Sequence, residues 1–166
     1  MESGVVGTGW DLPDEVRDRT EFHWFHVPPG GELLLGCLSP CPLWYVGHYH
    51  KGRMRACRGD ECPLCAMGTG RQIRWVLSCM DLRTHRVGVL EVGDGPGRVI
   101  KDSCGGNGRL RGLILAIRHT SKAKQSRLEV EVIHEPPPPR LMSTEALDLK
   151  EVLFSTWDRA AHCDRV

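Results

Sequence analysis

The sequence predicts a mostly-β fold. Short segments rich in β-branched and aromatic residues recur along the chain and are separated by turns rich in Gly, Pro, Asn and Asp. Several of these segments alternate apolar and polar side chains, most strictly at residues 127–133. A cysteine-rich stretch at residues 57–65 interrupts this pattern. At 166 residues, the chain is long enough for one domain with a proper hydrophobic core.

The first part of the chain is expected to supply separate strands. Residues 21–27 are rich in strand-forming aromatics and end at a Pro-Pro-Gly-Gly turn. An apolar run follows at 32–37, and a second strand is predicted at 43–50. In that strand, alternation places Trp44, Val46, His48 and His50 on one face and Leu43, Tyr45, Gly47 and Tyr49 on the other.

The later segments are expected to form two hairpins and two helices. The hairpins pair residues 72–80 with 86–92 and residues 110–118 with 127–133, and a short helix is predicted near 97–102. Beyond the proline run at 136–139, Ser143 or Thr144 is expected to cap a helix that extends to about Ala161. Five to six strands, one small helix and an inserted loop favour an OB-like Greek-key barrel.

These elements divide the chain into four parts. We expect a flexible acidic arm at 1–20, the OB-like domain at 21–135 with its cysteine loop at 48–65, a stiff proline spacer at 136–142 and a C-terminal helix at 143–166. No run approaches the ~18 consecutive apolar residues of a membrane span, and no targeting segment is recognisable. A soluble, cytoplasmic protein is therefore expected.

The cysteine stretch predicts a closed zinc site. Cys62 and Cys65 form a Cys-x2-Cys pair on a tight turn, and Cys57 is close enough to supply a third thiolate. His48 or His50 would complete a Cys3His set, since both leave the same face of the preceding strand. The alternative is that these cysteines are buried apolar side chains or form a disulfide. In a reducing compartment, however, clustered cysteines more often hold metal.

Charge is strongly segregated along the chain. Residues 51–127 carry 16 Lys and Arg against 6 Asp and Glu, whereas the rest of the chain carries 6 basic and 15 acidic residues. A basic centre between acidic ends is typical of a nucleic-acid groove, because Lys and Arg displace condensed counterions from phosphates. The alternative is a solvated basic face. The basic segment also contains the cysteine loop, which favours the groove.

The order of these motifs resembles the zinc-containing single-stranded DNA-binding proteins of T-even phages. The resemblance covers about residues 43–133 and is carried by Val46-Gly47-His48, Cys57, Cys62-Pro63-Leu64-Cys65, the strand with Arg74-Trp75-Val76-Leu77, and the strands at 113–118 and from Arg127. It implies an OB-fold core, a zinc ion held by His48, Cys57, Cys62 and Cys65, and a DNA cleft near Trp75, Arg74, Tyr49 and Arg118. It also implies a role in DNA replication or recombination.

A single-stranded nucleic-acid site combines aromatic faces for base stacking with basic side chains for phosphates. The candidate stacking residues are Trp44, Tyr45, Tyr49 and Trp75, although burial in the barrel is the alternative for each. The candidate phosphate contacts are Arg53, Arg55, Arg58, Arg71, Arg74, Arg111, Arg118, Lys122 and Lys124. We expect single-stranded DNA in preference to RNA, bound without sequence specificity in a bacterial or phage-like setting.

Two other classes of function are alternatives to this one. The first is an adaptor subunit of an RNA-guided effector, transposition complex or replisome, contacting protein partners through the zinc loop and the C-terminal helix. The second is a zinc nucleobase deaminase, which requires a His-x-Glu element before Pro-Cys-x2-Cys. Here the order is Cys-Pro-x-Cys, and His50 stands where that Glu would follow His48. We therefore expect no enzymatic activity.

Overall fold

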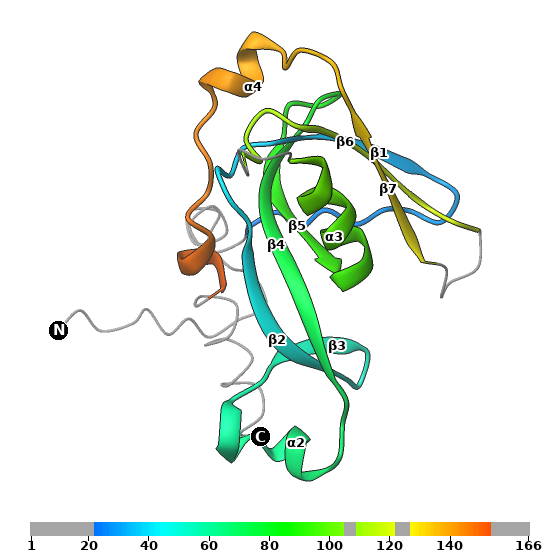
Figure 1. Ribbon diagram of the computed structural model, residues 1–166, viewed down its shortest axis with the longest axis vertical. Helices are drawn as coiled ribbons and strands as arrows, with labels where there is room; N and C mark the ends of the chain where they lie inside the picture. Colours follow the sequence, from blue (N-terminus) through cyan, green and yellow to red (C-terminus); the bar gives the residue numbers. More distant parts are fainter. Residues whose placement is uncertain (1–21, 105–108, 122–126, 154–166) are drawn as a thin grey trace, which may run out of the picture.

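A computed structural model describes residues 22–104, 109–121 and 127–153 of the chain. Its main element is a seven-stranded antiparallel sheet that curls without closing, so that it forms a half-barrel (Figure 1). The strands are β1 (Glu32–Cys37), β2 (Leu43–His50), β3 (Arg53–Ala56), β4 (Arg71–Asp81), β5 (Val87–Gly93), β6 (Ile114–His119) and β7 (Leu128–Ile133). The mostly-β prediction is confirmed. None of the described helices is both long and apolar enough to cross a membrane.

The long strand β4 joins the two parts of the sheet. Its first half, Arg71–Val76, pairs with β2, and its last residues, Cys79–Asp81, pair with β1. Strand β5 pairs along the opposite edge of β4, and β6 and β7 continue the sheet beyond β1. The β2–β3 hairpin and the cysteine loop therefore lie at one end of the molecule, and α4 (Pro139–Ser143) lies at the other (Figure 1).

The strand β3 was not predicted from the sequence. It is a four-residue strand that pairs with the end of β2 through a two-residue turn at Lys51 and Gly52. Both turn residues have positive φ values, 48° and 78°, as expected for the hairpin turn whose twist matches that of its strands. The turn folds the cysteine loop back towards β2.

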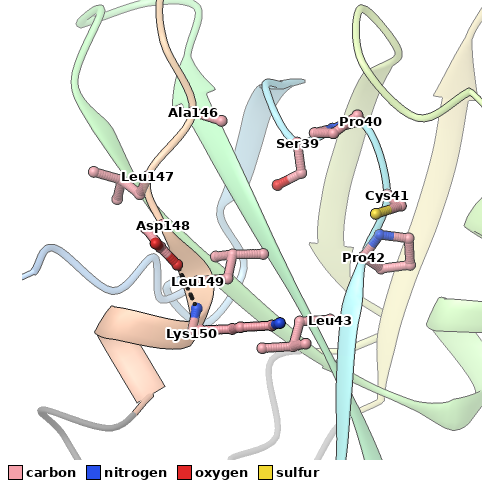
Figure 2. A pocket seen from close by; sticks show the side chains of 10 residues that line it. All are labelled: Ser39, Pro40, Cys41, Pro42, Leu43, Ala146, Leu147, Asp148, Leu149 and Lys150. Carbon is pink, nitrogen blue, oxygen red and sulfur yellow. Dashed lines mark hydrogen bonds between the residues drawn. The ribbon is translucent and has the colours of Figure 1, made fainter.

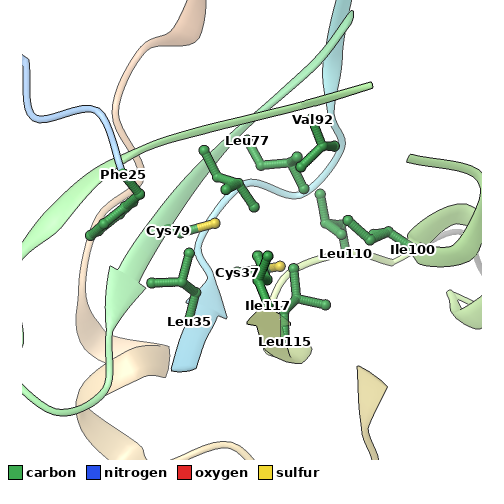
Figure 3. Close-up of a cluster of buried hydrophobic side chains, with 11 residues drawn as sticks. Phe25, Leu35, Cys37, Leu77, Cys79, Val92, Ile100, Leu110, Leu115 and Ile117 are labelled. Atoms are coloured by element: carbon green, nitrogen blue, oxygen red, sulfur yellow. The ribbon is translucent and has the colours of Figure 1, made fainter. Parts of the chain in front are cut away.

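The main core fills the concave side of the sheet. Leu35 and Cys37 of β1 pack there against Leu77 of β4 and Leu115 of β6 (Figure 3). We call this side the inner face; on β4 it holds the odd-numbered residues 71–79, and on β2 the even-numbered residues 44–50. The helix α3 (Asp94–Ser103) adds Ile100 to this core. It begins earlier than the predicted helix near 97–102.

The helix α3 lies against the inner face at Trp75. An added methyl group at Gly97 would overlap the indole ring, with its Cβ 2.6 Å from the indole Nε1. The same nitrogen lies 3.5 Å from a carboxylate oxygen of Asp94 at the start of the helix. Close packing of helix on indole therefore holds Trp75 at the edge of the core.

A second apolar cluster covers the outer face of the sheet. Tyr45, Val76 and Val89 project there and are covered by Leu149 and Val152 from the last described segment. Two polar contacts fasten the chain leading to this segment. The Ser78 hydroxyl accepts a hydrogen bond from the Leu147 N–H at 2.9 Å, and Arg111 donates to carbonyl oxygens of Leu38, Met142 and Thr144 at 2.7–2.9 Å.

Several predicted elements differ from the observed ones. The predicted strand at 21–27 is not extended over its described residues, 22–27, where Trp24 makes a single bridge to Val89. The proline spacer is interrupted, because Pro139 begins α4 and Ser143 ends it. Residues 145–148 are non-helical, and helical structure resumes at 149–153. The predicted helix therefore does not start at Ser143 or Thr144, and its remainder, like the arm at 1–20, lies outside the described residues.

Candidate metal centre and adjoining sheet face

Four predicted ligands converge at the end of β2. The ligand atoms of His48, Cys57, Cys62 and Cys65 all lie within 4.8 Å of one another, and such a set could hold a metal ion. His48 and Cys62 are buried, and the other two thiols are half-buried. His50, the alternative ligand, is not a member of this group.

The distances fit a tetrahedral ion. The Sγ atoms of Cys57 and Cys65 are 3.6 Å apart, and the Nε2 atom of His48 lies 3.5 Å from Sγ of Cys62 and 3.4 Å from Sγ of Cys65. Zinc bonds of about 2.3 Å to sulfur and 2.0–2.1 Å to nitrogen predict tetrahedron edges of about 3.8 Å and 3.5 Å. A disulfide is excluded, because its sulfur atoms would be about 2.05 Å apart. The cysteines are free thiols.

The imidazole of His48 is oriented by two carbonyl groups. Its Nδ1 atom lies 3.0 Å from the carbonyl oxygen of Thr69 and 3.1 Å from that of Gly70. A carbonyl can only accept, so Nδ1 carries the proton and Nε2 presents its lone pair to the three thiols. A hydrogen bond from the ring nitrogen that does not face the metal is the usual way in which a metal-binding histidine is held in a single tautomer. No sequence pattern indicates this contact, because every residue carries a backbone carbonyl.

Two short helical turns determine the positions of the three thiols. The turn η1 (Gly59–Glu61) follows Cys57, and α2 (Pro63–Ala66) carries Cys65, with Cys62 between them. Pro63 occupies the first position of α2, where its missing N–H costs no hydrogen bond. Gly59 has a φ of 75°, a conformation that favours glycine. The loop thus folds by local preferences that bring its thiols to one side.

The surroundings favour thiolates. Hydrogen bonds from the backbone, chiefly that of Arg58, lower the pKa of the Cys62 thiol to about 6. The pKa of Cys57 is also lowered, chiefly by the backbone at Gly59. The pKa of His48 is raised, chiefly by its hydrogen bond with Cys57. A site that concentrates negative charge around an imidazole attracts a cation, and a bound metal displaces the thiol protons.

Cys65 receives a guanidinium from β4. Both Nε and Nη2 of Arg71 lie 3.2 Å from its Sγ atom. The hydrogen bonds of Arg71 act to lower the pKa of Cys65, but burial and the adjacent thiols Cys57 and Cys62 prevail and the pKa is raised. Three neighbouring thiolates repel one another in the absence of a cation. Arg71 therefore offsets part of the charge that a Cys3His set retains around a divalent ion.

The inner face continues from this centre as an exposed stripe. It comprises Arg71, Ile73 and Trp44, which follow one another along β4 and β2 beside the buried His48. Trp44 is 59% exposed and Ile73 is 40% exposed. Arg55 pairs with His48 from the β3 side, so that an arginine stands in register on each side of the histidine. Aromatic, apolar and basic side chains thus share one surface.

The two exposed aromatics of β2 lie on opposite faces. Tyr49 is 58% exposed but lies an odd number of positions along the strand from Trp44, and the register of β2 is continuous between them. One strand of nucleic acid cannot stack on both without crossing the edge of the sheet. Tyr49 is therefore removed from the candidate surface that contains Trp44.

Other predicted contact residues have internal partners. The Tyr45 hydroxyl donates to Glu91 at 3.0 Å, and Arg74 donates to the other carboxylate oxygen at 2.8 Å. Tyr45 is buried and so has no open ring face for stacking, and its pKa is raised, chiefly by burial. Arg111 holds backbone carbonyls, and Arg118 pairs with Glu129 on the far strands. These side chains therefore have structural roles within the protein that do not require a bound phosphate.

The remaining candidates are distributed unevenly. Trp75 is half-buried beneath α3, and Arg58 is exposed on the cysteine loop. The backbone of Arg53 belongs to β3, but its side chain is outside the described part, as are Lys122 and Lys124. Ile73 was not among the predicted contact residues, although the alternation along 71–75 places it on the same face as Arg71 and Trp75; its partner on β2 is Val46.

A separate pocket of about 230 Å³ lies beside the C-terminal segment (Figure 2). It is lined mainly by apolar side chains from the β1–β2 connection and the start of β2, such as Pro42 and Leu43, and from residues 146–150. It contains none of the predicted ligands or contact residues. The metal centre remains the site where chemistry-bearing side chains converge.

Comparison of the chain with protein-family models, curated proteins and solved structures finds no match.

Proposed function

We propose that the chain is a zinc-stabilised module that binds single-stranded nucleic acid, with DNA preferred, without sequence specificity and in replication, recombination or another DNA-processing system. The observation that carries the proposal is the exposed stripe, in which Trp44 lies on the same sheet face as Ile73 and Arg71. Stacking surfaces combined with basic side chains bind unpaired strands, since every base has an aromatic face and every nucleotide a phosphate.

Zinc is the ion proposed for the metal centre. His48 and the three cysteines supply one imidazole nitrogen and three sulfurs at tetrahedral separations. This donor set suits zinc, and four protein ligands leave no position for a reactive water, which supports a structural role. The ion would hold the loop against β2 and thereby keep His48 and Arg55 in place beside Arg71, the end of the stripe nearest the metal centre.

A titration with matched variants tests the proposal. Fluorescein-labelled oligo-dT is titrated with the wild-type protein at about 50 and 200 mM salt, where contacts to phosphates predict a marked loss of affinity. Trp44→Ala should weaken binding by about 5- to 150-fold, because one stacked base contributes about 1–3 kcal/mol. Tyr49→Ala is the control, since Tyr49 is equally exposed but lies on the other face. Absence of binding by the metal-loaded wild type would refute the proposal.

An adaptor subunit is the second candidate function. The apolar pocket between the β1–β2 connection and residues 146–150 supports it, because such a pocket could receive an apolar side chain of a protein partner (Figure 2). The same titration separates the two candidates. If the metal-loaded protein does not bind the oligonucleotide even at low salt, the result favours the adaptor function.

A further inference from the structure

Arg71 uses only one edge of its guanidinium on Cys65. The two nitrogens that face the sulfur are Nε and Nη2, each at 3.2 Å. The guanidinium is planar and carries five N–H groups in a fixed fork. The opposite edge, formed by Nη1 and the second N–H of Nη2, therefore points away from the sulfur. Arg71 is an exposed residue, so this edge is directed towards solvent.

The Sγ atom of Cys65 accepts strong hydrogen bonds from Arg71 only when it is a thiolate. Cys65 is one of the four grouped ligands, and a bound cation would keep its sulfur deprotonated. Hydrogen bonds from a cation to an anionic acceptor are shorter and stronger than neutral ones. A metal-held thiolate would therefore restrict the rotamers of a long side chain that otherwise loses much entropy on binding.

The anchored arginine lies on the proposed binding face. It pairs with His48 in the sheet and is four residues from Trp75, which pairs with Trp44. The rise per residue of a strand places the Arg71–His48 pair and the Trp75–Trp44 pair about 13 Å apart along β4. A strand of nucleic acid stacked at Trp44 and running towards the metal centre would bring a phosphate to Arg71.

We infer that Arg71 is a phosphate-binding residue whose guanidinium is oriented by the metal-held thiolate of Cys65. The inference rests on the proposed function and deepens it, because it links the metal centre to the binding of the phosphate backbone. One edge of the guanidinium binds the sulfur, and the other binds two oxygens of a phosphate. The alternative is that Arg71 only stabilises the metal centre.

The experiment compares Arg71→Gln and Cys65→His, alone and combined, in oligo-dT titrations at several salt concentrations. Cys65→His retains four metal ligands but removes the thiolate, and zinc content is measured for every protein. Arg83→Gln is the control, because it removes the same charge at the opposite end of β4. A neutral histidine in place of a thiolate makes the centre more positive, so simple electrostatics predicts tighter binding by Cys65→His.

We expect Arg71→Gln to reduce the slope of log affinity against log salt by about 0.7, the value for one phosphate contact on a single strand. We expect Cys65→His to bind more weakly than wild type, and the combined variant to bind no more weakly than Cys65→His. If Arg71→Gln weakens binding equally in both backgrounds, the thiolate does not orient Arg71 and the inference fails.

Two further results decide the remaining cases. Should Cys65→His not retain zinc, Arg71→Lys replaces it, because lysine keeps the charge but cannot span a sulfur and a phosphate with a rigid fork. Full affinity of Arg71→Lys would overturn the inference, and a loss close to that of Arg71→Gln would support it. Binding by wild type with no effect of Arg71→Gln overturns the inference alone. No binding by zinc-loaded wild type overturns it together with the proposed function.

Discussion

The imidazole Nδ1 atom of His48 lies 3.0 Å from the carbonyl oxygen of Thr69, at the point where the cysteine loop returns to β4. This contact leaves the Nε2 atom facing the thiols. His50 lies on the same face of the same strand but is not a member of the ligand group. A single strand thus carries two histidines, only one of which is positioned to bind a metal.

Replacement of these two histidines should therefore have different effects. His48→Ala removes a ligand and is expected to abolish stoichiometric metal binding, whereas His50→Ala should retain it. Zinc content after gel filtration, together with the midpoint of thermal unfolding with and without a chelator, measures both outcomes. Equal zinc content in the two variants would show that His48 is not a ligand.

Arg71→Gln should loosen the metal centre without dismantling it. Residues that hydrogen-bond to metal ligands commonly contribute about 10- to 100-fold to metal affinity, and Arg71 donates two such bonds to Cys65. Competition with a chromogenic chelator measures this affinity. Arg83→Gln serves as the control, and an unchanged affinity in Arg71→Gln would mean that the contact with Cys65 does not stabilise the bound ion.

Gly97→Ala should destabilise the fold through Trp75. The added methyl group overlaps the indole ring, and overpacking of this kind costs about 1–3 kcal/mol. Gly95→Ala is the matched control in the same helix, because an added Cβ there meets no atom within 4 Å. Its cost should be smaller than that of Gly97→Ala, because the added Cβ meets only the restriction that Pro96 places on the residue before it. Urea unfolding followed by tryptophan fluorescence measures both, and equal stability of the two variants would contradict the packing.

Arg111→Met should release the connection between α4 and the sheet. The guanidinium donates to three backbone carbonyls, and their loss should cost about 1–3 kcal/mol in the free energy of unfolding. Arg109→Met, an exposed change two residues away, is the control. If Arg111 instead acted on phosphates, its replacement would alter the salt dependence of oligonucleotide binding and leave stability unchanged.

Ser78→Ala should weaken the attachment of the last described segment. The buried hydroxyl accepts the Leu147 N–H, and removal of the acceptor should cost about 1–2 kcal/mol. Hydrogen exchange at the Leu147 amide should also accelerate. Ser103→Ala, which removes a hydroxyl bonded within α3, should leave that amide unaffected.

The sequence by itself determined the features that depend on local pattern. The alternation of β2, the hairpin of β4 and β5, and the Cys-x2-Cys turn are all encoded within a few neighbouring residues. The ligand group could likewise be predicted, because the spacing of Cys62 and Cys65 is a local property. The choice between His48 and His50 could not be made from spacing alone, since both leave the same face of a strand.

Only the tertiary structure decided which of the exposed-looking residues share a surface. Tyr45 and Arg111 are residue types common in nucleic-acid-binding sites. In the fold, however, a distant segment buries Tyr45, and Arg111 donates hydrogen bonds to distant carbonyl groups. The short strand β3 exists because β2 offers it an edge. Residues 139–143 form the separate helix α4, and helical structure beyond Thr144 resumes only at residue 149. Burial and pairing are set by contacts between residues far apart in the chain, and no local pattern specifies these contacts.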